Sequence, residues 1–283
     1  MRTRILEAQT PAWAAVVAQS SQLIGGPGFC PLKRSARTAA GFVVVGGRRV
    51  FVKRVDEGSW LKGWLLRLRG SRAWRVLRGA GILKAAGFAH PEPLAAAEAR
   101  SFGAIRASYV ISEALDGARI MSEVVLAGGR RNFRRRCEIS GIVASEIRRL
   151  HDAGIYTLDL QETNLMLAGG DGAQWKIHFV DLEDFRCTRT VSARRRMLNL
   201  VHLDRTIGRF LPRTQRLRFF YNYLGGRPGR DQARDTLRQL LAIRERAERR
   251  AHAHQRAKAA APSRKGGGST ASESLSRAGA VRD

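Results

Sequence analysis

The sequence predicts an α+β protein of two lobes, a small β-rich lobe followed by a reduced, mostly helical one. Two β-branched runs flank a Gly-Gly turn between residues 41 and 55, which is the pattern of a β-hairpin. From about residue 132 onward, apolar residues recur with helical spacing instead. At 283 residues, the chain is long enough for one large domain or two small lobes.

The first lobe is predicted over residues 38–115, after a segment over 1–37 that shows no clear periodicity and is expected to be irregular. Helical periodicity follows the hairpin from Trp60 to Ala86, and a strand-like run occupies 107–113. The predicted strands therefore gather in one lobe, with a single helix among them.

The second lobe is predicted over residues 116–230 and is expected to be mostly helical. Its helices are predicted at 132–150, 193–210 and 216–224. Beyond it, a basic helix is expected over 231–258. A disordered tail is expected over 259–283, where Gly and Ser replace apolar residues.

The charge of the chain is strongly positive. Fifty-one Lys and Arg residues stand against 24 acidic residues, which gives a formal net charge of +27. Such a charge favours a polyanionic partner, whether nucleic acid, anionic lipid or a phosphorylated glycan. A compositional preference for Arg, Ala and Gly is the alternative cause, and charge alone does not choose between these partners.

Other features of the composition indicate a cytoplasmic protein. No apolar run approaches the roughly 20 residues that a membrane-spanning helix needs. An acid interrupts the basic N-terminus and no sustained apolar region follows it, so a secretory signal is not predicted. The cysteines Cys30, Cys137 and Cys187 are odd in number and widely spaced, as expected of reduced thiols.

The candidate chemistry lies in a polar loop and the two short strands that follow it. Asp159 precedes Asn164 by five positions, an apolar strand follows at once, and a second strand ends at Asp181. This order resembles the core of protein-kinase-like phosphotransferases, in which one Asp accepts the proton of the attacking hydroxyl. The Asn and the later Asp hold Mg²⁺ there. Singly, each could be an ordinary turn or capping residue, and Asp184 competes with Asp181.

Two residues of the hairpin are candidates for binding the phosphates of ATP. Lys53 stands between apolar residues on a strand, where an unpaired charge is unfavourable. Its alternative role is that of an edge-strand lysine that points to solvent. Gly41 could let the backbone approach a phosphate, although no complete Gly-x-Gly-x-x-Gly occurs, and Gly46-Gly47 fits a hairpin turn better.

Together these motifs are similar to those of the lipopolysaccharide core kinase family, the Kdo and heptose kinases. The resemblance is carried by Val52–Arg54, Gly87–Ala95, Leu150–Leu160, Val180–Arg186 and two later helical runs, Arg194–Leu200 and Arg216–Leu224. It implies that Lys53 binds ATP phosphates, that Asp159 is the catalytic base, and that Asn164 and Asp181 bind Mg²⁺. The implied acceptor is a sugar of a lipid-linked core oligosaccharide at the cytoplasmic face of the inner membrane.

The sequence departs from the family pattern in two places. Thr157-Leu158 stands where the family usually has His, often with Arg, before the catalytic Asp. The helix after Ser71 contains no Glu to pair with Lys53, which leaves Asp56 or Glu57 as candidate partners. Other readings therefore stay open: a kinase for another small molecule or a protein, a pseudokinase, or a basic scaffold that binds anionic membrane or nucleic acid.

Overall fold

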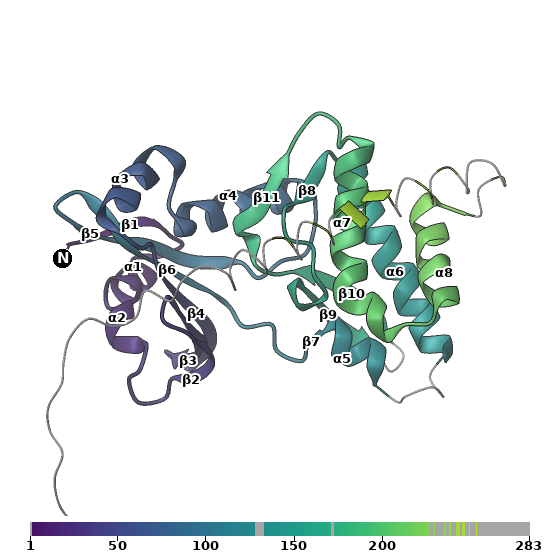
Figure 1. Ribbon diagram of the computed structural model, residues 1–283. Helices are drawn as coiled ribbons and strands as arrows, with labels where there is room; N and C mark the ends of the chain where they lie inside the picture. Colours follow the sequence, from purple (N-terminus) through teal and green to yellow (C-terminus); the bar gives the residue numbers. More distant parts are fainter. Residues whose placement is uncertain are drawn as a thin grey trace, which may run out of the picture. The chain divides into compact units, whose positions relative to one another are not determined.

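The computed structural model describes residues 2–127, 133–170 and 173–226, together with isolated residues between 229 and 253. The chain divides into two compact units, Met1–Ile243 and Arg244–Asp283. All elements described below belong to the first unit (Figure 1). The predicted tail lies outside the described residues, as does most of the predicted basic helix.

The first lobe is built on an antiparallel sheet with the strand order β1-β5-β6-β4-β3-β2. Its strands are β1 (Arg2–Ala8), β2 (Cys30–Arg34), β3 (Thr38–Val45), β4 (Arg48–Asp56), β5 (Pro93–Ser101) and β6 (Ala104–Glu113). The predicted hairpin is confirmed as β3–β4, since Val45 pairs with Arg48 across a turn in which Gly46 and Gly47 have positive φ. Chain alternation then places Val52 on one face of the sheet and Lys53 on the other.

The prediction that residues 1–37 are irregular is wrong. β1 pairs with β5 at one edge of the sheet, and β2 pairs with β3 at the other. Between them lie α1 (Pro11–Ala18) and the short α2 (Ser20–Leu23), and the Thr10 side chain caps α1 by accepting from the Trp13 N–H. Both strands are edge strands with largely exposed side chains, so they lack the alternation of apolar residues by which a strand is recognised.

The single helix predicted from Trp60 to Ala86 is two helices, α3 (Trp60–Arg69) and α4 (Arg72–Ala85). Gly70 ends α3 with φ +80°, a conformation that favours glycine. The Ser71 hydroxyl then starts α4 by accepting from the Trp74 N–H. A glycine followed by a capping serine thus sets a new helix direction within an apparently continuous apolar pattern.

The second lobe is mostly helical, as predicted. Its helices are α5 (Met121–Leu126), α6 (Phe133–Asp152), α7 (Ala193–Ile207), α8 (Arg213–Leu224) and the short 3-10 turns η2 (Glu162–Asn164), η3 (Leu182–Asp184) and η4 (Gly208–Phe210). Its strands are β7 (Arg119–Ile120), β8 (Ile155–Thr157), β9 (Leu165–Gly170), β10 (Ala173–Phe179) and β11 (Phe185–Cys187). In the part of the chain that the structure describes, no helix has the length and apolar character needed to cross a membrane.

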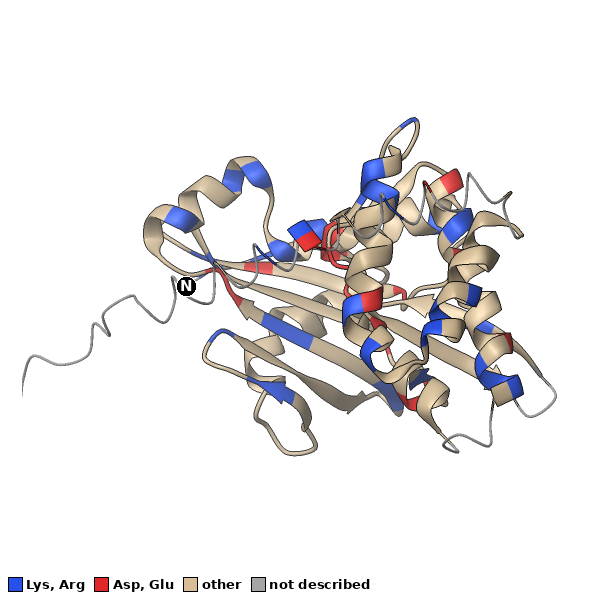
Figure 2. Cartoon of the chain, turned by 45° about the vertical axis from the view of Figure 1, so that its right-hand side comes forward, with Lys and Arg blue, Asp and Glu red and all other residues tan. Residues whose placement is uncertain are grey.

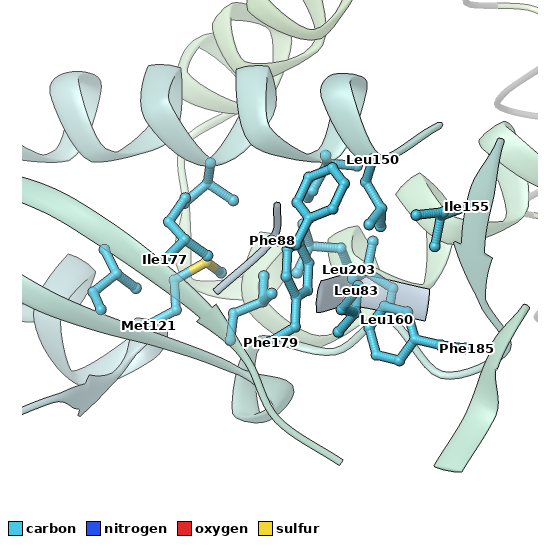
Figure 3. Packing of buried hydrophobic residues seen from close by; sticks show 14 of the residues in the cluster. Leu83, Phe88, Met121, Leu150, Ile155, Leu160, Ile177, Phe179, Phe185 and Leu203 are labelled. Carbon is cyan, nitrogen blue, oxygen red and sulfur yellow. The ribbon is translucent and has the colours of Figure 1, made fainter. Parts of the chain in front are cut away.

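The larger hydrophobic core joins α4 to the second lobe. Leu83 of α4 and Phe88 pack with Leu150 of α6 and with Phe179 and Phe185, as Figure 3 shows. The rings of Phe88, Phe179 and Phe185 meet edge to face, with centroids 5.7–5.8 Å apart. This core flanks the segment from Phe179 to Phe185, so it fixes the strand end that carries Asp181.

Candidate active site

The loop between β8 and β9 holds Asp159 through hydrogen bonds to its backbone and to its carboxylate. Asn164 Nδ2 donates to the Asp159 carbonyl oxygen at 3.0 Å. The Asp159 N–H donates to Thr157 Oγ1 at 3.2 Å, and the Gln161 side-chain amide donates to Asp159 Oδ1. The structure therefore brings the two predicted residues Asp159 and Asn164 together and leaves Asp159 half-buried.

A buried polar network holds the start of this loop from α7. Asn199 Nδ2 donates to the Thr157 carbonyl oxygen at 2.6 Å, and Asn199 Oδ1 accepts from the Thr157 N–H at 3.4 Å. His151 Nε2 lies 3.1 Å from Asn199 Oδ1, and its Nδ1 lies 2.8 Å from the Tyr223 hydroxyl. Position 157 is therefore anchored through its backbone, without the His that the family usually has there.

The network makes stability depend on pH through His151. Burial lowers the pKa of His151 from 6.5 to about 4, which outweighs the hydrogen bond to Asn199. The unfolded chain therefore binds a proton that the folded chain excludes, so this contribution is complete above pH 6.5 and is lost as the pH falls towards 4. The loss amounts to about 3 kcal/mol.

Urea unfolding at a series of pH values measures this effect. We expect the difference in unfolding free energy between the wild type and His151→Gln to shrink between pH 6.5 and 4, because Gln does not titrate. A difference that stays constant over this window would mean that His151 is not the group responsible.

Asp181 follows β10 and adopts a left-handed backbone conformation. The Val180 N–H donates to the Asn164 carbonyl oxygen at 3.0 Å, so the residue before Asp181 is tied to the catalytic loop. Asp181 itself has φ +57°, and among the described residues only Phe102 is a second non-glycine residue with positive φ. Asp is one of the few non-glycine residue types that adopt this conformation readily, so the turn favours Asp at this position.

Lys53 lies on strand β4, and its side chain reaches the turn that contains Asp181. Its Nζ lies 2.9 Å from Asp181 Oδ1 and 2.9 Å from Glu183 Oε1. Burial alone would lower the pKa of Lys53, but the charges and hydrogen bonds of the two carboxylates raise it above its ordinary value. The lysine is thus charged and paired, and the alternative of an edge-strand lysine that points to solvent is wrong.

Glu183 takes the place of the glutamate that α4 lacks. This carboxylate is 4% exposed and lies within 4 Å of three cations: 2.9 Å from Lys53, 3.1 Å from Arg72 and 3.7 Å from Arg75. Here α4 supplies the two arginines, and the carboxylate comes from the turn after Asp181. The ion pairs still connect α4, Lys53 and the Asp181 turn. The cations now come from α4 and the carboxylate comes from the turn, which is the reverse of the expected arrangement.

Neither of the two acids expected to pair with Lys53 does so. Glu57 is buried and accepts from the Arg72 N–H at 2.8 Å and from the Ser108 hydroxyl, so it fixes the start of α4. Asp56 lies 3.9 Å from Arg54. The competing site residue Asp184 lies 3.8 Å from Arg75. Asp181 is the acid that pairs with Lys53 and directly follows Val180, whose N–H bonds to the Asn164 carbonyl oxygen.

α4 approaches the Asp181 turn so closely that only glycine fits at one position. A Cβ atom on Gly79 would overlap the carbonyl oxygen of Leu182, whereas a Cβ on Gly81 of the same helix would meet nothing within 4 Å. We expect Gly79→Ala to destabilise the fold by about 1–3 kcal/mol through overpacking, and to displace Asp181. The matched Gly81→Ala should be neutral or stabilising by up to about 1 kcal/mol.

Thermal unfolding of both variants measures the change in stability. Mg²⁺-dependent ATP binding measures whether Asp181 is displaced. Equal behaviour of the two variants would show that the contact between Gly79 and Leu182 does not constrain the turn.

Gly41 lies apart from the other predicted residues. It pairs with Val52, on the face of the sheet opposite to Lys53, and a Cβ there would overlap the Cys30 carbonyl oxygen and approach the Phe29 ring. Close packing against β2 thus gives a reason for glycine at this position. Its contact with phosphate stays a prediction.

Asn164 and Asp181 offer the oxygen donors that Mg²⁺ prefers. Among the described residues, no group of three or more His, Cys, Asp or Glu side chains is placed to hold a metal ion. Mg²⁺ in phosphoryl-transfer sites takes one or two protein carboxylates, and phosphates and water complete its shell. The small donor set of one amide and one carboxylate therefore fits this ion.

Comparison with known proteins identifies the fold and the family of the chain. A solved structure described as WaaP in complex with acyl carrier protein matches with a TM-score of 0.62 and 21% identity, over 88% of this chain and 99% of that chain. This likeness confirms the two-lobed, kinase-like fold. No curated protein matches the sequence significantly. The model of the lipopolysaccharide kinase (Kdo/WaaP) family matches residues 42–223, and the chain therefore belongs to this family of kinases.

Proposed function

We propose that the protein transfers the γ-phosphate of ATP, in the presence of Mg²⁺, to a sugar hydroxyl of the lipopolysaccharide inner core, on Kdo or heptose. The observation that carries the proposal is one connected set of contacts. Asp159 bonds to Asn164, Asn164 bonds to the residue before Asp181, and Asp181 bonds to Lys53. These four residues occur in the order along the chain that is typical of phosphoryl-transfer sites.

Asp159 is proposed as the base. Its Oδ2 faces no partner among the hydrogen bonds of the loop, while Oδ1 is held by Gln161. As the acceptor oxygen forms its bond to the γ-phosphorus, the hydroxyl proton passes to Asp159. The bond between the γ-phosphorus and the bridging oxygen breaks, and ADP leaves with that electron pair. The loop contributes positioning, because its backbone is fixed before the acceptor binds.

Lys53, Asn164 and Asp181 are proposed to bind the nucleotide. The raised pKa of Lys53 keeps its ammonium charged beside the phosphates. Asn164 and Asp181 would hold Mg²⁺, which neutralises phosphate charge when it is bound. Glu183 is proposed as a positioning residue, because its buried carboxylate lies 2.9 Å from Lys53 Nζ and holds the ammonium in place.

The proposed acceptor is anionic and lipid-linked, and the net charge of +27 suits such a substrate. We place the reaction at the cytoplasmic face of the inner membrane, with the protein bound peripherally. The WaaP of the matching structure is in complex with acyl carrier protein, so an acyl carrier protein is a partner to test for this chain as well.

Calorimetry of ATP binding with and without Mg²⁺ tests the nucleotide site. We expect saturable, Mg²⁺-dependent binding to the wild type and its loss in Asp181→Asn. The control is Asp116→Asn, which makes the same change in charge at an exposed acid paired with Arg49. The control is needed because a protein of this charge attracts polyphosphates nonspecifically. Binding that ignores both Mg²⁺ and Asp181→Asn would rule out the proposed site.

A further inference from the structure

Helix α3 packs on the sheet through a glycine and exposes its large apolar side chains. Its one buried residue is Gly63, where a Cβ would overlap the carbonyl oxygen of Ile105, so the helix lies on β6 through its backbone. Its large apolar side chains are directed outward. Leu61 is 76% exposed and Leu68 is 89% exposed, and Trp60, Trp64 and Leu65 are between 42% and 49% exposed. A helix that only needed to stabilise the fold would bury this face.

A neighbouring turn extends this apolar surface. Phe102, in the turn between β5 and β6, is 85% exposed, and its ring centroid lies 6.1 Å from that of Trp60. Its φ of +46° is a conformation in which Asn, Asp or Gly is usual. A phenylalanine is unfavourable in this turn in two ways, because its side chain is exposed and its backbone has a positive φ. A partner that covers Phe102 would remove the first of these disadvantages.

The charge around this surface has a single sign. Residues 58–91 contain seven Lys and Arg residues and no acidic residue. Of these, Lys62, Arg67 and Arg69 lie on α3 and are exposed, and the Arg67 guanidinium lies 4.9 Å from the Trp64 ring centroid. Figure 2 shows α3 in blue and tan only. Tryptophan and leucine interspersed with exposed cations are typical of helices that lie in the interface of an anionic membrane.

We infer that the α3 surface docks on an anionic phospholipid bilayer; the surface comprises Trp60, Leu61, Trp64, Leu65, Leu68 and Phe102 with Lys62, Arg67 and Arg69. The apolar tips enter the acyl boundary, the tryptophan rings lie at the depth of the headgroups, and the cations contact lipid phosphates. A bilayer fits this surface better than an acidic protein. The most exposed apolar residues, Leu61, Leu68 and Phe102, come from a helix and a separate turn, and a fluid bilayer can accommodate both elements.

This inference rests on the proposed peripheral position at the inner membrane and deepens it by naming the surface that contacts lipid. It depends on a surface that contains none of the residues assigned to ATP, Mg²⁺ or the acceptor hydroxyl. Its test measures binding to lipid and not catalysis, so either proposal can fail without the other.

The test is sedimentation of the full chain with vesicles of phosphatidylcholine alone or mixed with phosphatidylglycerol, at low and high salt. The variant combines Leu61→Ser, Leu68→Ser and Phe102→Asn, which changes no charge and places Asn in the turn where it is favoured. The control is Leu32→Ser with Val44→Ser, two exposed apolar residues on β2 and β3. Thermal unfolding verifies that both variants are folded.

We expect the wild type and the control to bind the anionic vesicles and to retain part of that binding at high salt. The triple variant should bind at least about tenfold more weakly, since two leucines and one phenylalanine can no longer enter the bilayer. Lipid should also shift the tryptophan emission of the wild type to the blue. Equal binding by the triple variant and the wild type would overturn the inference, because charge alone would then explain binding. If the triple variant instead loses binding to an acyl carrier protein while its vesicle binding is unchanged, the surface docks a protein and the inference is also overturned.

Discussion

Replacing Asp159 with Asn should reduce phosphotransfer by about 10²–10⁴-fold while the protein stays folded. The amide keeps the size of the carboxylate and can still bond to Gln161, but it cannot accept the proton of the acceptor hydroxyl. ATP binding should persist, because Lys53, Asn164 and Asp181 are unchanged.

Phosphate transfer measured together with thermal unfolding separates loss of chemistry from loss of fold. Asp116→Asn serves as the matched control, since it makes the same substitution at an exposed acid and should transfer phosphate at the wild-type rate. Transfer by Asp159→Asn at the rate of this control would show that the base lies elsewhere.

Replacing Glu183 with Ala should strongly destabilise the protein. It would leave Arg72 and Arg75 without their shared carboxylate and leave Lys53 with Asp181 alone. Removing one partner of a buried ion pair is unfavourable by about 3–5 kcal/mol. We expect the lower end of this range, because Arg72 is 42% exposed and its pair is screened by water.

Urea unfolding of Glu183→Ala and Glu183→Gln measures the effect. Gln keeps the shape and one hydrogen-bonding oxygen but removes the charge, so it should fall between the wild type and Ala. ATP affinity should fall in both variants, since Lys53 loses one of its two anchors. A destabilisation by Ala below about 0.5 kcal/mol, the level of an ordinary surface change, would mean that Glu183 does not hold the cluster together.

Much of the fold is predictable because its signals are local. The β3–β4 hairpin is specified by β-branched residues around Gly46-Gly47, and α6, α7 and α8 follow apolar periodicity. The break between α3 and α4 was missed because apolar residues continue across Gly70-Ser71. β5 was missed because its run of alanines has little intrinsic strand preference, and burial between its neighbours decides its conformation.

In the candidate site, too, the contacts between residues close in sequence are predictable, and those between distant residues are not. Asp159 and Asn164 are five residues apart, and Asp181 ends the next strand, so their spacing predicts that they meet. The partners of Lys53 lie about 130 residues further along the chain, and Asn199 anchors Thr157 from a different helix. Only the packed lobes bring such residues together. One local signal for the cluster did exist, since Arg72 and Arg75 lie three residues apart and so share a face of α4.

The central claim is most directly tested by incubating the purified protein with Mg²⁺, γ-labelled ATP and dephosphorylated inner-core lipid. The products are then separated by mass spectrometry. We predict that one phosphate is added to a Kdo or heptose residue of the lipid, that omission of Mg²⁺ prevents the addition, and that Asp159→Asn does not catalyse it. Label that appears on protein while the core sugar stays unmodified, in preparations that bind ATP with Mg²⁺, would contradict the proposed acceptor.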